Sequence, residues 1–155
     1  MQTIARKSLI AKSFLSNPSL FHRFYFNMSG VTPVFTAKAP APVASYSQAV
    51  KAGGFVYISG QVPLTAEGKL VEGHEDIQVQ TRQVLVNLKN VVEGAGSSWE
   101  KLVKINIFIT DMSKFGLVNE IYSEFFSAHK PARSCVAVKS LPLNVDVEIE
   151  AVALE

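Results

Sequence analysis

The 155-residue sequence has one cysteine, three widely spaced histidines and no long apolar run. The single Cys135 excludes an intrachain disulfide, which fits a reducing compartment. Because His22, His74 and His129 lie far apart, no His/Cys cluster has the spacing of metal ligands, and we predict no metal site. No apolar run approaches the ~20 residues that a membrane-spanning helix needs. These absences favour a globular chain without a disulfide, a metal or a membrane span.

Acidic residues are missing from the first part of the chain, where Glu67 is the first to occur. Residues 1–25 instead combine four basic residues with serines and apolar residues, a composition typical of a mitochondrial transit peptide. We therefore expect a removable transit peptide at residues 1–25 and a mature protein that begins near Phe26. The alternative is a basic tail without a targeting role. Met28 also leaves open a second start that gives a cytosolic form.

The remaining chain has a composition suited to one domain. Four of the 15 basic residues lie in residues 1–25, which leaves 11 against 13 acidic residues and a mildly acidic mature chain. This balance argues against a nucleic-acid-binding protein that relies on a basic surface. Residues 26–42 contain three prolines, which disfavour helix, so we expect a linker and entry segment there before a domain at residues 43–155.

Hydrophobic periodicity predicts strands and helices in the order ββαβαββ. Gly53-Gly54 separates the first two strands and is a two-residue hairpin signal, whereas Gly94 and Gly96 end the first helix. The predicted strands span 43–52, 55–62, 102–110, 132–138 and 146–154, and the predicted helices span 75–93 and 114–128. This order predicts an α+β fold in which two helices cover one face of the sheet.

The sheet face without helices is expected to carry both polar and apolar side chains. The mixture is too apolar for water and too polar for a dry core, so we expect subunits to associate through this face and leave polar clefts between them. The side chains expected there are Tyr57, Ser59, Gln61, Lys104, Asn106, Phe108, Arg133, Cys135 and Glu148.

The segment from Pro131 to Glu150 holds the main candidate for a binding site, and we expect its two strands to form a hairpin. Successive side chains of a strand point to opposite faces, so Arg133 and Cys135 share one face of the first strand. Glu148 and Glu150 likewise share one face of the second. If the faces coincide, a guanidinium, a thiol and two carboxylates converge on a site for a small carboxylate-bearing molecule. The alternative is an amphipathic hairpin with its charged face in water.

Several ordered motifs resemble those of the RidA (YjgF) family. They are YSQAV at residues 46–50, SGQVP at 59–63, LKNVVEGAG at 88–96, FGLVNEIYSEFF at 115–126, PARSCVAV at 131–138 and VEIEA at 147–151. The resemblance runs from about Thr32 to the C-terminus. It implies a chorismate-mutase-like subunit, a mixed β-sheet with two helices on one face, and a homotrimer with three sites at the subunit interfaces.

The resemblance also implies an activity, that of a 2-iminobutanoate/2-iminopropanoate deaminase in the mitochondrial matrix. Such a hydrolase converts 2-aminoacrylate and 2-aminocrotonate to 2-oxo acids and ammonia. It needs no cofactor, because the substrate is already activated. Its role would be to protect pyridoxal-phosphate enzymes and to support branched-chain amino-acid metabolism. Two alternatives stay open: an endoribonuclease or translation inhibitor, an activity attributed to some relatives, and a non-catalytic ligand-binding or chaperone-like trimer.

Site roles follow from the resemblance for seven residues. Arg133 is expected to bind the substrate carboxylate through its planar fork, and Glu148 to position and activate water. Tyr46 is expected to close the pocket and hydrogen-bond the ligand. The remaining residues expected to line the pocket are Ser59, Gly60, Asn119 and Cys135.

Three of these residues also have a purely structural interpretation. Arg133 is suited to an ion pair with Glu148 or with Glu150, and for Glu150 no family role is implied. Tyr46 is suited to aromatic packing, and Asn119 to a polar position on the surface.

Two departures from the family pattern bear on substrate preference. The loop at 126–131 is about three residues shorter than in many bacterial relatives, which reshapes the expected pocket rim. Ala44-Ser45 stands where many members have Gly-Pro, so the loop that carries Tyr46 is expected to be less rigid.

Overall fold

The computed structural model describes residues 30–155, so the expected transit peptide at residues 1–25 lies outside the described residues. Residues 33–155 form one unit, which holds both helices and the body of the sheet. The sheet has six strands in the order β1-β2-β3-β6-β4-β5. The strands are β1 (Val31–Val34), β2 (Ala49–Ala52), β3 (Phe55–Gln61), β4 (Leu102–Ile109), β5 (Ala132–Ala137) and β6 (Val147–Leu154).

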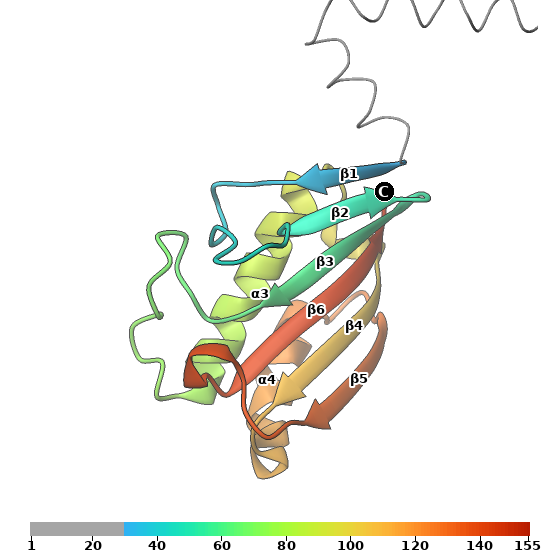
Figure 1. The fold of residues 1–155 in the computed structure, drawn as a ribbon. Helices are drawn as coiled ribbons and strands as arrows, with labels where there is room; N and C mark the ends of the chain where they lie inside the picture. Colours follow the sequence, from blue (N-terminus) through green and yellow to red (C-terminus); the bar gives the residue numbers. More distant parts are fainter. Residues whose placement is uncertain (1–29) are drawn as a thin grey trace, which may run out of the picture. The chain divides into compact units, whose positions relative to one another are not determined.

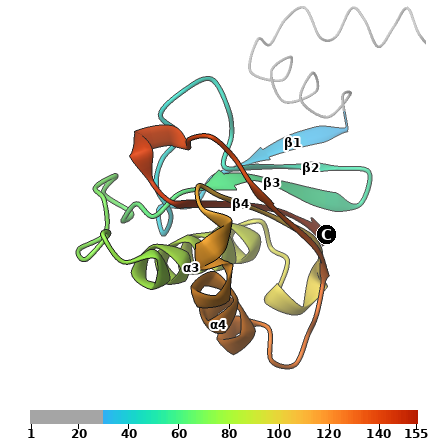
Figure 2. The same cartoon turned by 90° about the horizontal axis from the view of Figure 1, so that it is seen from below.

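Two helices, α3 (Ile77–Gly94) and α4 (Phe115–Phe125), lie against one face of this sheet (Figures 1 and 2). The α+β class and the placement of both helices on one face are therefore confirmed. Asp76 begins α3, since its side chain accepts a hydrogen bond from the backbone N–H of Gln78 at 2.8 Å. The Gly53-Gly54 hairpin is also confirmed, and both glycines have the positive φ that this turn requires.

The core lies between α3, α4 and the covered face of the sheet. On α3 the buried side chains recur at helical spacing, and on β4 and β6 they alternate along the strand. Each fully buried Leu, Ile or Val contributes roughly 1.5–3 kcal/mol to stability. The side chains of this core with almost no exposed area include Leu85, Leu88, Ile105, Ile107, Ile109 and Ile149.

The final hairpin that we expected is wrong. β6 pairs antiparallel with both β3 and β4 and lies between them. Within residues 30–155, β5 pairs only with β4, in parallel, and forms the edge of the sheet. The reason is burial: Val147, Ile149 and Ala153 of β6 are almost completely buried, so this strand occupies the middle of the sheet, whereas β5 has no fully buried residue.

A second difference concerns the approach to the first hairpin. The predicted strand at 43–52 is shorter in the structure, because only Ala49–Ala52 pairs in β2. Val43 is 82% exposed and belongs to a loop instead. This loop becomes one wall of the pocket described below.

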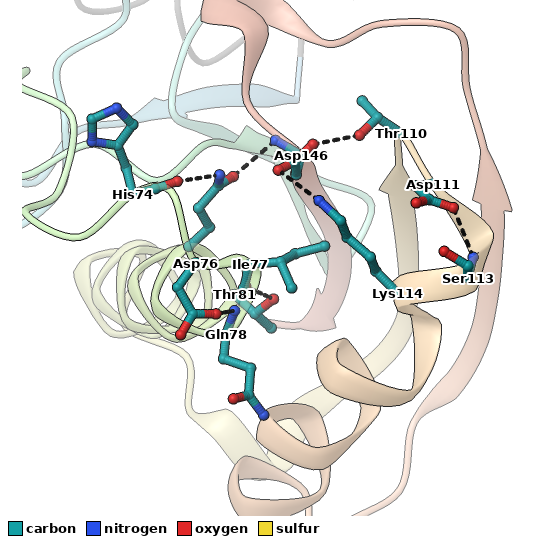
Figure 3. Close-up of polar contacts among 11 residues, drawn as sticks. His74, Asp76, Ile77, Gln78, Thr81, Thr110, Asp111, Ser113, Lys114 and Asp146 are labelled. Atoms are coloured by element: carbon teal, nitrogen blue, oxygen red, sulfur yellow. Dashed lines mark hydrogen bonds and ion pairs between the residues drawn. The ribbon is translucent and has the colours of Figure 1, made fainter.

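A polar network fixes the start of β6 (Figure 3). The Asp146 carboxylate accepts a hydrogen bond from the Thr110 hydroxyl at 2.6 Å and faces Lys114 Nζ at 3.4 Å. The Asp146 N–H donates to Gln80 Oε1 at 2.8 Å, and the amide of Gln80 donates to the His74 carbonyl at 2.6 Å. Since Asp146 lies two residues before Glu148, these bonds hold the strand that carries Glu148.

Candidate functional site

A pocket of about 480 Å³ opens beside Glu148, and we call it the glutamate pocket. Four residues that we expected in a site line it together: Tyr46, Ser59, Gly60 and Glu148. The rest of the lining is largely apolar and comes from the loop before β2, the end of β3 and the turn before β6. These other residues are Pro40, Ala41, Val43, Ala44, Gln48, Gln61, Val62, Leu64, Pro142 and Leu143.

A β-bulge in β3 places Gly60 against the Glu148 carboxylate. The register with β6 moves from Ile58 opposite Ala151 to Gln61 opposite Ile149, so β3 holds one extra residue at Ser59–Gly60. A Cβ atom added to Gly60 would overlap Glu148 Oε1 and come within 2.8 Å of its Cδ. Gly60 is therefore needed for close approach, and the carboxylate rests on its backbone.

Because of the same bulge, our expectation that Gln61 faces away from the helices is wrong. We expected its side chain on the open face, with Tyr57 and Ser59, but Gln61 pairs with the buried Ile149 and is only 6% exposed. One extra residue in a strand moves every later side chain to the opposite face of the sheet. A prediction from strict alternation cannot anticipate such a bulge.

The Glu148 carboxyl group is perturbed by its surroundings. Burial raises the pKa of its carboxyl group, and the nearby charge of Glu150 raises it further. No residue between 30 and 155 donates a hydrogen bond to this carboxylate, so its lone pairs remain available to water or a ligand. Glu150, by contrast, accepts a hydrogen bond from Asn106 Nδ2 at 2.8 Å. The two glutamates share one face of β6 but differ in their hydrogen bonding.

Gln48 was missed as a site residue, although it stands inside the YSQAV motif. Its side chain is 2% exposed and makes a set of bonds with the loop that forms the pocket wall. Gln48 Oε1 accepts from the Thr36 N–H at 2.6 Å, and its amide donates to the carbonyls of Ala39 and Pro40 at 3.2 and 2.9 Å. Its place in the YSQAV motif, two residues after Tyr46, was the only available signal. Gln48 thus holds the segment from Thr36 to Pro40, which contributes Pro40 to the pocket wall.

Arg133 lies on the opposite face of the sheet from Glu148, and our expectation that they share a face is wrong. Across the parallel pair, Arg133 stands beside Ile105, whose side chain is buried beneath the helices. Across the antiparallel pair, Glu148 stands beside Phe108, on the open face. Lys104, Asn106 and Phe108 do lie on the open face as we expected, but Arg133 and Cys135 face the helices. The register of β5 against β4, which sets Arg133 beside Ile105 and Cys135 beside the buried Ile107, produces this result.

A second concavity of about 270 Å³ surrounds Arg133, and we call it the arginine pocket. Arg133 Nη1 donates to Asn119 Oδ1 at 2.9 Å, which brings these two expected site residues together. The guanidinium also lies over the rings of Tyr122 and Phe115. Within residues 30–155 Arg133 forms no ion pair, so neither Glu148 nor Glu150 neutralises it inside the subunit. The lining residues are Asn119, Tyr122, Ser123, Phe126, Lys130, Pro131 and Arg133.

Cys135 is partly buried and packs against the core. Its side chain contacts the hydrophobic core from the edge strand. Burial raises the pKa of its thiol, and this outweighs the opposing effect of the nearby Arg133 charge. A raised pKa disfavours the thiolate form, so the environment does not activate this cysteine as a nucleophile.

Over residues 30–155, no helix combines the length and apolarity needed to cross a membrane. The same residues include no group of three or more His, Cys, Asp or Glu side chains arranged to hold a metal ion.

The chain is similar to a set of known proteins over most of its length. A family model described as Endoribonuclease L-PSP matches residues 36–155, which include both pockets. Protein MMF1, mitochondrial, of Saccharomyces cerevisiae is 50% identical over 125 residues, covering 81% of this chain and 85% of the relative. Protein mmf1, mitochondrial, of Schizosaccharomyces pombe is 45% identical over 156 residues, covering 98% of this chain and 94% of the relative.

Solved structures share the fold. The crystal structure of yeast Mmf1 has a TM-score of 0.77 at 50% identity and covers 81% of this chain and 98% of that one. E. coli TdcF with bound serine has a TM-score of 0.74 at 39% identity and covers 80% of this chain and 98% of that one. The six-stranded sheet with two helices is therefore a fold that these relatives have in common.

Proposed function

The chain belongs to the endoribonuclease L-PSP family, also known as the YjgF/RidA family, and we propose that it hydrolyses reactive 2-enamines and 2-imines such as 2-aminocrotonate and 2-aminoacrylate. The products are a 2-oxo acid and ammonia. The observation that carries the proposal is Glu148, a carboxylate with a raised pKa and no hydrogen-bond partner among residues 30–155, held in a largely apolar pocket. The serine bound to a related structure supports a small amino-acid-like ligand.

The proposed reaction needs a carboxylate that both accepts and returns protons. An enamine substrate first takes a proton at its β-carbon and becomes the imine. Water then adds to the C=N carbon: Glu148 accepts one proton of the water and returns it to the nitrogen, while the hydroxyl stays on the carbon. When the C–N bond of the resulting carbinolamine breaks, Glu148 takes the proton of this hydroxyl and passes it to the nitrogen, which leaves as ammonia. A raised pKa suits Glu148 to this exchange near neutral pH.

We further propose that the active site is shared between subunits of a homotrimer. Arg133 and Glu148 lie on opposite faces of the sheet, so one subunit cannot place both on one small substrate. The open face carries exposed apolar side chains, including Tyr57 and Val136, which association would cover. In this arrangement the arginine pocket of one subunit meets the glutamate pocket of the next, and Arg133 binds the substrate carboxylate through its two-pronged fork.

Complementation between two inactive variants tests the shared site. Arg133→Ala and Glu148→Gln trimers should each be inactive, and equal co-expression should produce mixed trimers. Each mixed ring then contains one interface with an intact Arg133 and an intact Glu148, so activity should return to about a quarter of the original. If the mixture stays as inactive as its parents, both pockets do not act on the same substrate molecule across subunits.

The activity itself is tested by coupling the full chain to a threonine dehydratase in the presence of semicarbazide. The protein should divert the imine to free 2-oxobutanoate and lower the amount that semicarbazide traps. An unchanged partition between the two products would overturn the deaminase proposal. A parallel incubation with RNA addresses the activity that the family name describes. RNA cleavage without imine hydrolysis would replace the proposal, and 2-oxobutanoate binding without either reaction would indicate a binding module.

We also propose that the protein acts in the mitochondrial matrix after removal of residues 1–25. Two relatives of 45–50% identity carry a mitochondrial designation, and the basic, acid-free composition of residues 1–25 fits a transit peptide. In that compartment the activity would protect pyridoxal-phosphate enzymes of branched-chain amino-acid metabolism. N-terminal sequencing of the organellar protein should begin near Phe26, and a sequence that begins at Met1 would overturn the assignment.

A further inference from the structure

A continuous stack of planar groups extends from Arg133 into the helical layer. Arg133 Cζ lies 4.5 Å from the centroid of the Tyr122 ring. The Tyr122 ring stacks on Phe126, with centroids 4.3 Å apart and planes 26° apart. Phe126 stacks in turn on Trp99, with centroids 4.6 Å apart and planes 27° apart. The guanidinium is therefore the outermost member of a stack anchored in the core.

This stack gives the guanidinium a preferred position over the Tyr122 ring. A cation above an aromatic ring is attracted by the negative charge density of the ring face, and a flat guanidinium gains most when it stacks. Phe115 adds a second ring, 5.5 Å from Arg133 Cζ. Asn119 occupies one Nη1 donor at 2.9 Å, which limits rotation of the guanidinium. The other N–H donors of Arg133 remain available to a carboxylate.

The hydroxyl of Tyr122 takes no part in this arrangement. The residue is 8% exposed, and within residues 30–155 its oxygen has no hydrogen-bond partner. Burial raises the pKa of this hydroxyl, so it stays neutral. An unpaired buried hydroxyl is a cost to stability, which leaves the ring as the part of Tyr122 that the site uses.

From this geometry we infer that Tyr122 is a positioning residue for substrate affinity: its ring sets the plane of Arg133 and so aims the fork at the substrate carboxylate. The inference rests on the proposed function, in which Arg133 binds that carboxylate. Tyr122 itself touches no reacting atom. It therefore governs the binding of the carboxylate and leaves the chemical step at Glu148 unaffected.

Calorimetric binding of 2-oxobutanoate to the full chain tests the inference. Tyr122→Phe keeps the ring and should bind within about twofold of the original protein, whereas Tyr122→Leu should bind about tenfold more weakly. In turnover of the imine, Tyr122→Leu should raise KM by a similar factor and leave kcat unchanged. Phe125→Leu is the matched control, because Phe125 lies on the same helix, outside the arginine pocket, with its ring centroid 5.9 Å from Arg82 Cζ. It contacts the stack at its far end, where its ring centroid lies 6.0 Å from that of Trp99.

A double-mutant cycle separates positioning from general destabilisation. If Tyr122 acts through Arg133, Tyr122→Leu should cost little further affinity in an Arg133→Lys background. Full additivity, or unchanged binding by Tyr122→Leu, would overturn the inference. Tyr122→Met replaces the leucine variant if that one fails to assemble, and it should show the same loss. If the binding pattern holds while the imine is not hydrolysed, only the proposed reaction fails; if the original protein binds no 2-oxobutanoate, this inference fails as well.

Discussion

The glutamate pocket and the arginine pocket are built in opposite ways. Loops and a strand bulge form the first, where Glu148 rests on the Gly60 backbone with no hydrogen-bond partner among residues 30–155. A helix and an edge strand form the second, where Arg133 is held by Asn119 and two aromatic rings. This difference suits the roles that we propose: proton exchange by Glu148 uses free lone pairs and a raised pKa, whereas carboxylate binding by Arg133 uses a fixed orientation.

The same contrast appears within β6. Glu148 and Glu150 are two residues apart on one face, yet Asn106 binds only Glu150. The strand pairing explains the difference, because Asn106 stands directly opposite Glu150 and the apolar Phe108 stands opposite Glu148. A single neighbour thus distinguishes the two carboxylates.

The largest expected effect comes from removing the proton acceptor of the glutamate pocket. Glu148→Gln keeps the shape of the side chain but cannot accept a proton, so imine hydrolysis should fall by about two orders of magnitude or more while 2-oxobutanoate binding is nearly retained. Glu150→Gln is the matched control and should lose far less activity. Light scattering must show the same assembly for both variants. Full activity in Glu148→Gln would remove the glutamate from the reaction.

A methyl group at the floor of the same pocket should have the next largest effect. Gly60→Ala forces the Glu148 carboxylate to move, and a displacement of about 1 Å can lower a rate roughly 100-fold. The moving atom belongs to a flexible side chain, so thermal stability should change little. Gly116→Ala is the control, since a Cβ there meets no atom within 4 Å. Equal kcat values for Gly60→Ala and Gly116→Ala would contradict the close approach that we describe.

Replacing the planar guanidinium of Arg133 should weaken the binding of a carboxylate ligand without removing the electrostatic attraction to it. Arg133→Lys keeps the positive charge but loses the planar pair of donors, so the affinity for 2-oxobutanoate should fall by roughly 1–3 kcal/mol. Calorimetry measures this directly. Arg82→Lys, which changes an arginine paired with Glu124 away from the pocket, should bind as before. A loss shared by both variants would point to altered folding.

A smaller effect is expected at the turn before β6, which forms part of the glutamate pocket. Leu143 has φ of 58° and is 58% exposed, so its backbone is strained and its side chain contributes little burial. Leu143→Asn should raise the free energy of unfolding by about 1 kcal/mol, because asparagine tolerates this conformation. Leu143→Ala removes the side chain and keeps the strain, so it should not stabilise. Chemical denaturation of both variants distinguishes these outcomes.

The smallest expected effect is a pH-dependent difference in stability. The native pKa of Glu148 lies above its ordinary value of 4.5, so the folded protein binds this proton more tightly than the unfolded chain does. The resulting stability is fully present below about pH 4.5 and is lost as the pH rises through the native pKa. Glu148→Gln should therefore be more stable than the original protein at neutral pH, and the difference should disappear below pH 4.5. Thermal melts across this range measure it, and a constant difference would contradict the pKa shift.

Local order in the sequence determined the kind and position of most elements. The two helices, the Gly53-Gly54 hairpin and the alternating strands follow from periodicities of a few residues, which depend only on neighbours along the chain. The grouping of Tyr46, Ser59, Gly60 and Glu148 in one pocket agrees with what the motifs had indicated. The elements were predictable from local pattern, whereas the grouping of the four residues was expected only from the resemblance of the motifs to a family.

Only the tertiary structure decided which faces meet. The order of the strands depends on the apolar surface that all strands together bury. This burial places β6 in the middle of the sheet and β5 at its edge. The face of Arg133 then followed from the register that pairs it with the buried Ile105, and the face of Gln61 from a one-residue bulge, which reverses side-chain direction. Alternation along a strand states which residues share a face, but packing against the rest of the molecule decides which face it is.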